Sequence, residues 1–254
     1  MKGKVYLVGS GPGGTAFLTQ RGRAVIDKAD VVLFDQLPGE EILATLPETA
    51  EKIDCGKYGG KHTLEQEEIE TLMVDRASKG RLVVRLKGGD PFLFGRGGEE
   101  LETIRAAGIP VEMVPGISSA LAVPASVGIP LTHRTYASQV TILTGNEDPT
   151  KPGPALDWEL LAKSRGTIVI LMGVANLKKI ADALLRNDKA ATTPVAIIER
   201  GLRKDSRVTT APLEGIAAAA EKAGVKPPAV IVIGDVVSLY DPAQPDLIPL
   251  EDTL

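Results

Sequence analysis

The stretch that most strongly determines the fold is Arg85-Leu86-Lys87-Gly88-Gly89-Asp90-Pro91-Phe92-Leu93-Phe94-Gly95-Arg96-Gly97-Gly98-Glu99-Glu100, which begins where the apolar run Leu82–Val84 ends. A Gly-Gly-Asp-Pro turn lets backbone come close to a ligand and offers a carboxylate to a polar group. Lys87 and Arg96 flank the turn, so anions can be held beside it. The alternative is a tight strand-to-helix connection with salt bridges. The many glycines and the proline in this stretch favour a binding loop on a rigid scaffold.

Strand-like and helical stretches alternate on both sides of this loop. Predicted strands cover residues 4–8, 31–34, 82–86, 111–114, 140–144, 167–172, 194–199 and 230–237, and a short strand at 206–210 makes the second sheet mixed. Predicted helices cover residues 16–29, 63–79, 97–107, 176–186 and 212–223, the second starting at a capping box Thr63-Leu64-Glu65-Gln66. This alternation predicts two α/β domains, 1–115 with a mostly parallel sheet and 116–245 with a mixed one.

Composition excludes several classes of protein. The chain has 254 residues, a net charge of −4 and a pI near 5.4, which argues against nonspecific nucleic-acid binding. Cys55 is the only cysteine, so no internal disulfide or cysteine metal cluster is expected. Neither His62 nor His133 has the ligand spacing of a metal site. No apolar run approaches the ~20 residues of a membrane span, so we expect a soluble cytoplasmic protein.

The amino-terminal loop has a pattern that is also typical of a different function, dinucleotide binding. Gly9, Gly11 and Gly14 follow a predicted strand in the spacing of a dinucleotide site, and Asp35 ends the next strand where an acidic residue binds a ribose. This pattern keeps an NAD-dependent dehydrogenase open as an alternative, as well as a tight turn that binds nothing. Pro12 weakens the dinucleotide interpretation, because it lacks the backbone N–H that a pyrophosphate requires.

Basic residues gather at predicted strand-to-loop edges in this acidic chain. Lys57, Lys61 and His62 lie in one glycine-rich loop, and His133 and Arg134 follow a proline turn. Each group taken alone is equally consistent with a solvated loop. Together with Lys87 and Arg96, they predict a cleft that binds anions.

Two segments of the chain resemble the signatures of a known protein family. Val8–Thr19, V-G-S-G-P-G-G-T-A-F-L-T, and Val84–Glu100, V-R-L-K-G-G-D-P-F-L-F-G-R-G-G-E-E, resemble the two signatures of the uroporphyrinogen-III C-methyltransferases, a family of tetrapyrrole methyltransferases. Residues 29–35, 115–120, 128–134 and 171–173 fit as well, so the resemblance runs from about residue 3 to 240. The Gly-Arg-Gly-Gly-Glu-Glu extension is its most specific part, because related methyltransferases and diphthine synthase usually share only Gly-Asp-Pro.

The resemblance implies a two-domain α/β homodimer that binds S-adenosyl-L-methionine in a cleft between its domains. Such enzymes methylate uroporphyrinogen III at two ring carbons, C2 and C7, giving precorrin-2 by way of precorrin-1 and releasing S-adenosyl-L-homocysteine. Precorrin-2 feeds sirohaem and cobalamin biosynthesis. The chain length resembles that of the free-standing enzyme, without the fused domains of some relatives.

The resemblance also implies roles for individual residues. Asp35 matches the family's proposed proton acceptor and Lys57 its proposed proton donor. Gly14 stands where many members have Asp, so any role of that side chain is absent. Lys61, Arg96, His133 and Arg134 are candidates to bind substrate carboxylates, beside Lys57. The implied cofactor-binding residues are Pro12, Gly88, Gly89, Asp90, Leu93, Ser118, Ser119, Met172, Gly201 and Ala229.

Three alternatives remain open at this point. One is a sibling methyltransferase that acts on a later corrin intermediate or on a protein residue. The second is the nicotinamide-dependent dehydrogenase, and the third is a binding module without catalytic activity. Binding of S-adenosyl-L-methionine and activity on uroporphyrinogen III discriminate among them.

Overall fold

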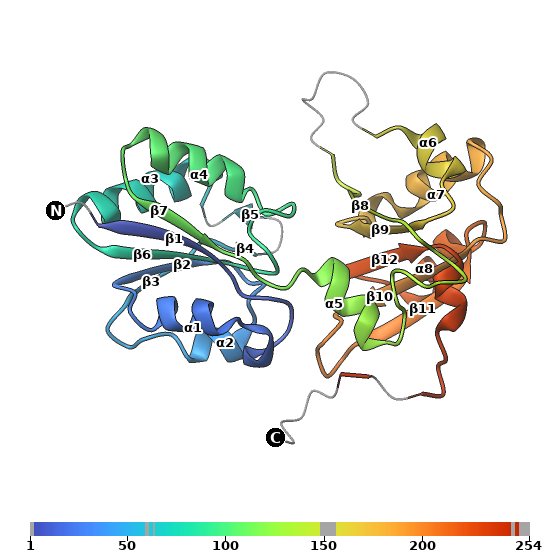
Figure 1. The fold of residues 1–254 in the computed structure, drawn as a ribbon, viewed down its shortest axis with the longest axis horizontal. Helices are drawn as coiled ribbons and strands as arrows, with labels where there is room; N and C mark the ends of the chain where they lie inside the picture. Colours follow the sequence, from blue (N-terminus) through green and yellow to red (C-terminus); the bar gives the residue numbers. More distant parts are fainter. Residues whose placement is uncertain (1–2, 59–60, 63, 148–155, 245–246, 249–254) are drawn as a thin grey trace. The chain divides into compact units, whose positions relative to one another are not determined.

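The structure, a computed structural model, describes residues 3–58, 61–62, 64–147, 156–244 and 247–248. The chain forms two compact units, Met1–Ser119 and Ala120–Leu254. The predicted boundary between the domains lies slightly earlier, at residue 115. Each unit is an α/β domain, as predicted, and each is described by itself (Figure 1).

The first unit is built on a five-stranded sheet in which all neighbouring strands run parallel. In spatial order the strands are β3 (Glu51–Asp54), β2 (Val31–Phe34), β6 (Leu82–Lys87), β1 (Lys4–Gly9) and β7 (Val111–Val114). A parallel sheet is covered on both faces, which explains the near-continuous Val, Ile and Leu runs of its strands. Because the strands share one direction, their carboxyl ends lie along one edge.

Helices cover both faces of this sheet (Figure 1). On one face, α1 (Gln20–Ile26) and α2 (Glu40–Ala44) contribute buried residues to a core with Val8, Val32 and Leu86. On the other, α3 (Gln66–Ser78) and α4 (Gly97–Ala106) pack against Leu7 and Leu33. Successive residues of a strand therefore alternate between two apolar cores.

Helix α3 begins later than predicted. The sequence predicts Thr63 as its cap with Gln66 as the partner, but Thr63 lies outside the described residues and the cap is Glu65. The backbone N–H of Glu65 donates to Oε2 of Glu68 at 2.7 Å. A glutamate at this position satisfies an amide at the helix start and favours the positive end of the helix dipole.

The second unit has a five-stranded mixed sheet. In spatial order its strands are β11 (Arg207–Pro212), β10 (Pro194–Glu199), β12 (Ala229–Ile233), β9 (Thr167–Leu171) and β8 (Val140–Thr144). β8 and β9 are parallel, and the other neighbouring pairs are antiparallel. The predicted short strand at 206–210 is the edge strand β11, and it runs antiparallel to β10, which confirms the mixed sheet.

Helices α6 (Trp158–Lys163), α7 (Leu177–Arg186) and α8 (Ile216–Ala223) share one apolar core with this sheet. The sequence pattern did not predict α6. It also did not predict α5 (Ser119–Ser126), a short helix of small residues that contains Pro124. The predicted strand at 230–237 is too long, because β12 ends at Ile233 and a 3₁₀ turn, η3 (Asp235–Leu239), follows Gly234. The φ angle of +140° at Gly234 breaks the extended chain.

A small hairpin pairs β4 (Lys57–Tyr58) with β5 (Lys61–His62). The structure describes only the backbone of these four residues. Across the described part of the chain, no helix has both the length and the apolar character that crossing a membrane requires. Nor do the described residues contain a group of three or more His, Cys, Asp or Glu that can hold a metal ion.

We predict that acid weakens the second unit through Glu199. This fully buried carboxylate accepts hydrogen bonds from Arg207 Nε at 2.6 Å and from the Lys226 N–H at 2.9 Å. Burial raises the pKa of Glu199, but those hydrogen bonds outweigh burial and the net pKa is lowered. The unfolded chain therefore binds this proton more readily, so the stabilisation is complete above pH about 5 and is lost as the pH falls further.

Fluorescence of Trp158 in α6 reports urea unfolding of the second unit and measures this effect. Glu199→Gln is expected to flatten the fall in unfolding midpoint between neutral and acidic pH. The exposed Glu221 provides the control, since Glu221→Gln leaves that pH dependence intact. Equal slopes for wild type and Glu199→Gln would refute the prediction.

Candidate active site

The loops after β1 and β6 lie side by side at the carboxyl edge of the first sheet. β1 and β6 are neighbouring strands, but the chain leaves β1 toward α1 on one face and β6 toward α4 on the other. Such a divergence of connections is where open α/β sheets bind ligands. The motif Arg85–Glu100 therefore begins at the position where the topology favours a ligand-binding site.

Glycines bring three loops into contact at this edge. A Cβ on Gly9 would lie 2.5 Å from the Gly89 carbonyl oxygen, and a Cβ on Gly116 would lie 2.1 Å from the same atom. Gly11 and Gly89 also exchange two backbone hydrogen bonds, at 3.0 and 3.2 Å. We call Gly9, Gly11, Gly89 and Gly116 the glycine junction. It fastens together the loops that follow β1, β6 and β7.

Asp90 joins two of these loops through both of its carboxylate oxygens. Oδ1 accepts from the Phe92 N–H at 2.9 Å, and Oδ2 accepts from the Gly116 N–H at 3.1 Å. The first bond shapes the turn of the motif, and the second ties that turn to the loop after β7. The predicted role of Asp90 in cofactor binding stays a prediction, and these two bonds show that its carboxylate also organises the loop.

The amino-terminal loop does not have the arrangement of a dinucleotide site. A 3₁₀ turn, η1 (Thr15–Phe17), follows the glycines, and α1 starts only at Gln20 with Thr19 as its cap. The Gly11 N–H, which a pyrophosphate would need, already donates to Gly89. The predicted helix at 16–29 is therefore shorter than expected.

Most predicted cofactor residues of the first unit gather around the junction. An added Cβ on Gly89 would occupy a small space bounded by Ile117 O, Ser118 Cα and Ser119 N, at 3.8 to 4.0 Å. Pro12 and Ser118 are buried, whereas Leu93 is half-buried. The structure thus brings together the predicted residues Pro12, Gly88, Gly89, Asp90, Ser118 and Ser119.

The remaining predicted cofactor residues share one edge of the second sheet. Strand register pairs Glu199 of β10 with Ala229, and Val230 with Leu171 of β9. Met172 follows β9 directly, is half-exposed and has a φ of +56°. Gly201 follows β10, and a Cβ there would lie 2.3 Å from Val123 of α5. Antiparallel pairing therefore places Met172, Gly201 and Ala229 at neighbouring strand ends.

Asp35 lies at the carboxyl edge of the first sheet, directly after β2. Its Oδ1 accepts from the Leu37 N–H at 2.9 Å, and its side chain is 24% exposed. Its other oxygen, Oδ2, is 3.7 Å from Nη2 of the buried Arg85. The side chain of Lys57, its predicted partner in proton transfer, lies outside the described residues.

The predicted substrate-binding cations belong to both units. Arg96 is exposed, but its guanidinium forms a two-pronged ion pair with Glu99, with contacts of 2.6 to 3.1 Å. His133 and Arg134 are exposed in the second unit, where His133 Nδ1 accepts from the Thr135 N–H. The side chain of Lys61 lies outside the described residues. The predicted convergence of these cations on one cleft stays a prediction.

Lys87, which the sequence places beside the turn as a candidate to hold an anion, is buried. It is 5% exposed and its Nζ donates to Glu100 Oε1 at 2.8 Å. Burial lowers the pKa of Lys87, and the neighbouring Arg85 lowers it further, while Glu100 opposes both. The burial of Arg85 and Glu100 was not predicted from the sequence. One signal was present: Val83, Arg85 and Lys87 are spaced two residues apart, so they lie on the same face of the strand.

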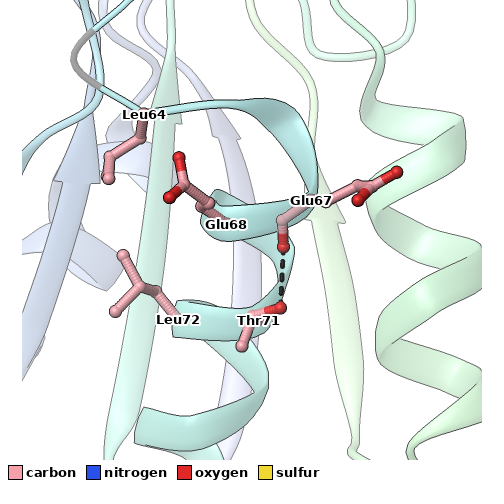
Figure 2. A pocket seen from close by; sticks show the side chains of 5 residues that line it. All are labelled: Leu64, Glu67, Glu68, Thr71 and Leu72. Atoms are coloured by element: carbon pink, nitrogen blue, oxygen red, sulfur yellow. Dashed lines mark hydrogen bonds between the residues drawn. The ribbon is translucent and has the colours of Figure 1, made fainter.

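Other features of the molecule are poor candidates for this site. Figure 2 shows a pocket on α3 lined by Leu64, Glu67, Glu68, Thr71 and Leu72. Its two glutamates repel anionic ligands, and the Thr71 hydroxyl donates to the Glu67 carbonyl at 2.7 Å. Burial raises the pKa of the Cys55 thiol to about 11, so it is not a nucleophile at neutral pH.

Residues 4–217 match the family model of tetrapyrrole (corrin/porphyrin) methylases. An S-adenosyl-L-methionine-dependent uroporphyrinogen III methyltransferase of Methanosarcina barkeri is 58% identical over 239 residues, 94% of each chain. A uroporphyrinogen-III C-methyltransferase of Methanocaldococcus jannaschii is 48% identical over 95% of this chain and 99% of its own. The crystal structure of a Thermus thermophilus uroporphyrin-III C-methyl transferase complexed with S-adenyl homocysteine superposes with a TM-score of 0.81, at 40% identity, covering 94% of this chain and 100% of that one.

We predict that the glycine junction does not tolerate a side chain. Gly116→Ala places a methyl group against Gly89 O and the Gly9 backbone, and is expected to lower the free energy of unfolding of the first unit by about 1–3 kcal/mol. Amide hydrogen exchange in β1 and β6 measures this loss. Gly98, in the same motif but with nothing within 4 Å of an added Cβ, is the control. Gly98→Ala should leave exchange unchanged or slower, and equal effects of the two changes would contradict the prediction.

Proposed function

Because this chain belongs to the tetrapyrrole (corrin/porphyrin) methylase family, we propose that it is an S-adenosyl-L-methionine-dependent uroporphyrinogen III C-methyltransferase. It adds methyl groups at C2 and C7 of the substrate to give precorrin-2 by way of precorrin-1. The observation that carries this proposal is the 58% identity to the Methanosarcina barkeri enzyme over 94% of both chains. An alignment of 239 of the 254 residues spans the Val84–Glu100 segment and both units.

The cofactor-binding residues of this proposal come from both units. In the first, Gly88 and Gly89 let backbone approach the cofactor, Asp90 holds the loop in shape, and Pro12, Leu93, Ser118 and Ser119 surround it. In the second, Met172, Gly201 and Ala229 lie at neighbouring ends of β9, β10 and β12. When bound, S-adenosyl-L-methionine supplies an electrophilic methyl group on its sulfonium, so the protein need not provide a nucleophile.

The protein's task is then to orient the substrate and to accept a proton. Transfer of the methyl group to a fully substituted ring carbon leaves a positive charge on the tetrapyrrole. The tetrapyrrole then loses a proton from another of its atoms, and Asp35 is the proposed acceptor. It lies at the carboxyl edge of the first sheet, held by the Leu37 N–H and partly exposed. Lys57 is the proposed donor. Alignment of the two reactants supplies much of the acceleration, and a partly dehydrated site favours the loss of charge from sulfur.

Uroporphyrinogen III carries eight carboxylates, so cationic side chains are expected to bind it. Lys61, Arg96, His133 and Arg134 are the proposed partners, with Arg suited to two-pronged pairing. The net charge of −4 is compatible with this, because local cations decide how a polycarboxylate binds. We propose in addition that the enzyme is a cytoplasmic homodimer.

An anaerobic assay tests the proposal directly. Purified protein is incubated with S-adenosyl-L-methionine and enzymatically made uroporphyrinogen III, and product mass and absorbance are followed. A gain of two methyl groups is expected. Binding of S-adenosyl-L-methionine without methylation would move the substrate to a sibling pathway. Binding of NAD in place of S-adenosyl-L-methionine would refute the proposal in favour of a dehydrogenase.

We predict that Asp35 and Asp90 affect different steps. Asp35→Asn keeps an acceptor for the Leu37 N–H but removes the base, so kcat should fall by about 10²–10⁴-fold while the Kd for S-adenosyl-L-methionine is unchanged. Asp90→Ala frees the Phe92 and Gly116 amides and should raise that Kd. Calorimetry and steady-state kinetics measure both. Equal losses of affinity and turnover in Asp35→Asn would show that Asp35 is only a structural cap.

A further inference from the structure

Three charged side chains form a buried cluster beneath the carboxyl edge of the first sheet. Arg85 and Lys87 lie on β6 and Glu100 lies on α4, and each is 5% exposed or less. Oε1 of Glu100 accepts from Arg85 Nε at 3.1 Å and from Lys87 Nζ at 2.8 Å. Gln66 Nε2 of α3 donates to the same oxygen at 3.2 Å. We call Arg85, Lys87 and Glu100 the inner ion cluster.

This cluster is unusual for the strand that carries it. β6 is the central strand of a parallel sheet, where both faces are normally apolar. Its residues Val83, Arg85 and Lys87 point to the face covered by α3 and α4, so two cations replace apolar side chains there. A buried ion cluster is often no more stable than well-packed apolar residues of the same volume. The presence of this cluster is therefore weak evidence for added stability, and its contacts with other groups become informative.

Arg85 connects the cluster to the partly exposed Asp35. Its guanidinium has a different partner in each direction: Nε faces Glu100, Nη1 donates to the Leu86 carbonyl at 3.4 Å, and Nη2 faces Asp35 Oδ2 at 3.7 Å. The Leu37 N–H holds the other oxygen of Asp35. Both oxygens of this carboxylate are thus oriented, one by its own loop and one by a buried cation.

We propose that Arg85, held in place by Glu100, is a positioning residue that orients the Asp35 carboxylate for proton abstraction. Lys87 and Gln66 hold Glu100, so the orientation passes from α3 and α4 through β6 to the loop after β2. This inference rests on the proposed function, because it assigns Asp35 the role of base. Arginine suits the task, since its planar fork can bind several partners in fixed directions, whereas lysine is a single charge on a flexible chain.

A double-mutant cycle tests the proposal on the full chain with uroporphyrinogen III as substrate. Arg85→Met should lower kcat by about tenfold to a hundredfold, with the Kd for S-adenosyl-L-methionine unchanged. In the Asp35→Asn background the same change should lower kcat no further, because the group that Arg85 orients is already lost. Arg85→Lys, which keeps the charge and the packing, should fold and recover part of the lost kcat. If the two losses multiply, Arg85 acts independently of Asp35 and the proposal fails.

A matched control separates positioning from stability. Arg76 in the last turn of α3 pairs with Glu51 at the amino end of β3, on the opposite edge of the same sheet. Arg76→Met should lower the unfolding midpoint but leave kcat unchanged. A fall in kcat as large as that of Arg85→Met would show that any broken ion pair in this unit slows the reaction, which would overturn the proposal.

A structural measurement keeps the inference independent of the proposed substrate. Crystal structures of wild type and Arg85→Met should differ in the direction of the Asp35 carboxylate, and an unchanged Asp35 side chain would refute the positioning role. If wild-type protein binds S-adenosyl-L-methionine but does not methylate uroporphyrinogen III, the proposed function fails, while this comparison still decides whether Arg85 orients Asp35.

Discussion

Close contact between three backbone loops is the constraint on which the rest of the site depends. The parallel sheet brings the ends of β1, β6 and β7 to one edge, and only glycine at Gly9 and Gly116 allows their backbones to approach Gly89. Asp90 then fastens the junction through the Phe92 and Gly116 amides. The loop motif thus makes a rigid support first, and the ligand-binding groups take their positions from it.

The periodic parts of this fold were predictable from sequence because they depend on local pattern. The strands β2, β7 and β10 have the predicted bounds, since continuous apolar runs between turn residues have few alternatives. The cap of α3 and the helix α5 were not predictable in the same way. Thr63 and Glu65 both suit a cap, and the run of small residues in α5, with Pro124 inside, carries a weak helical signal. Choices of that kind are decided by tertiary packing.

The loops of the candidate site were predictable from sequence, but the contacts of their charged side chains were not. Lys87 was expected to hold an anion beside the turn, yet Glu100, thirteen positions further along, pairs with it in the core. Asp90 is predicted to bind the cofactor, and the structure adds a hydrogen bond from the Gly116 N–H to one of its oxygens that the sequence does not indicate. Both partners are distant in the sequence, and one-dimensional spacing does not show which side chain will reach which. The alternation of Val83, Arg85 and Lys87 along β6 was the one local sign that these cations face a core.

The two glutamates that end the motif divide its cations into two kinds of ion pair. Glu99 and Glu100 are consecutive on α4, so they point in different directions around the helix. Glu99 pairs with Arg96 in solvent, where an ion pair contributes little and another carboxylate can replace Glu99 at low cost. Glu100 pairs with Arg85 and Lys87 in the core, where removing one partner leaves an uncompensated charge. One short segment therefore carries an exposed cation whose partner can be exchanged, as the proposed binding of a polycarboxylate requires, and a fixed cation, as the proposed positioning of Asp35 requires.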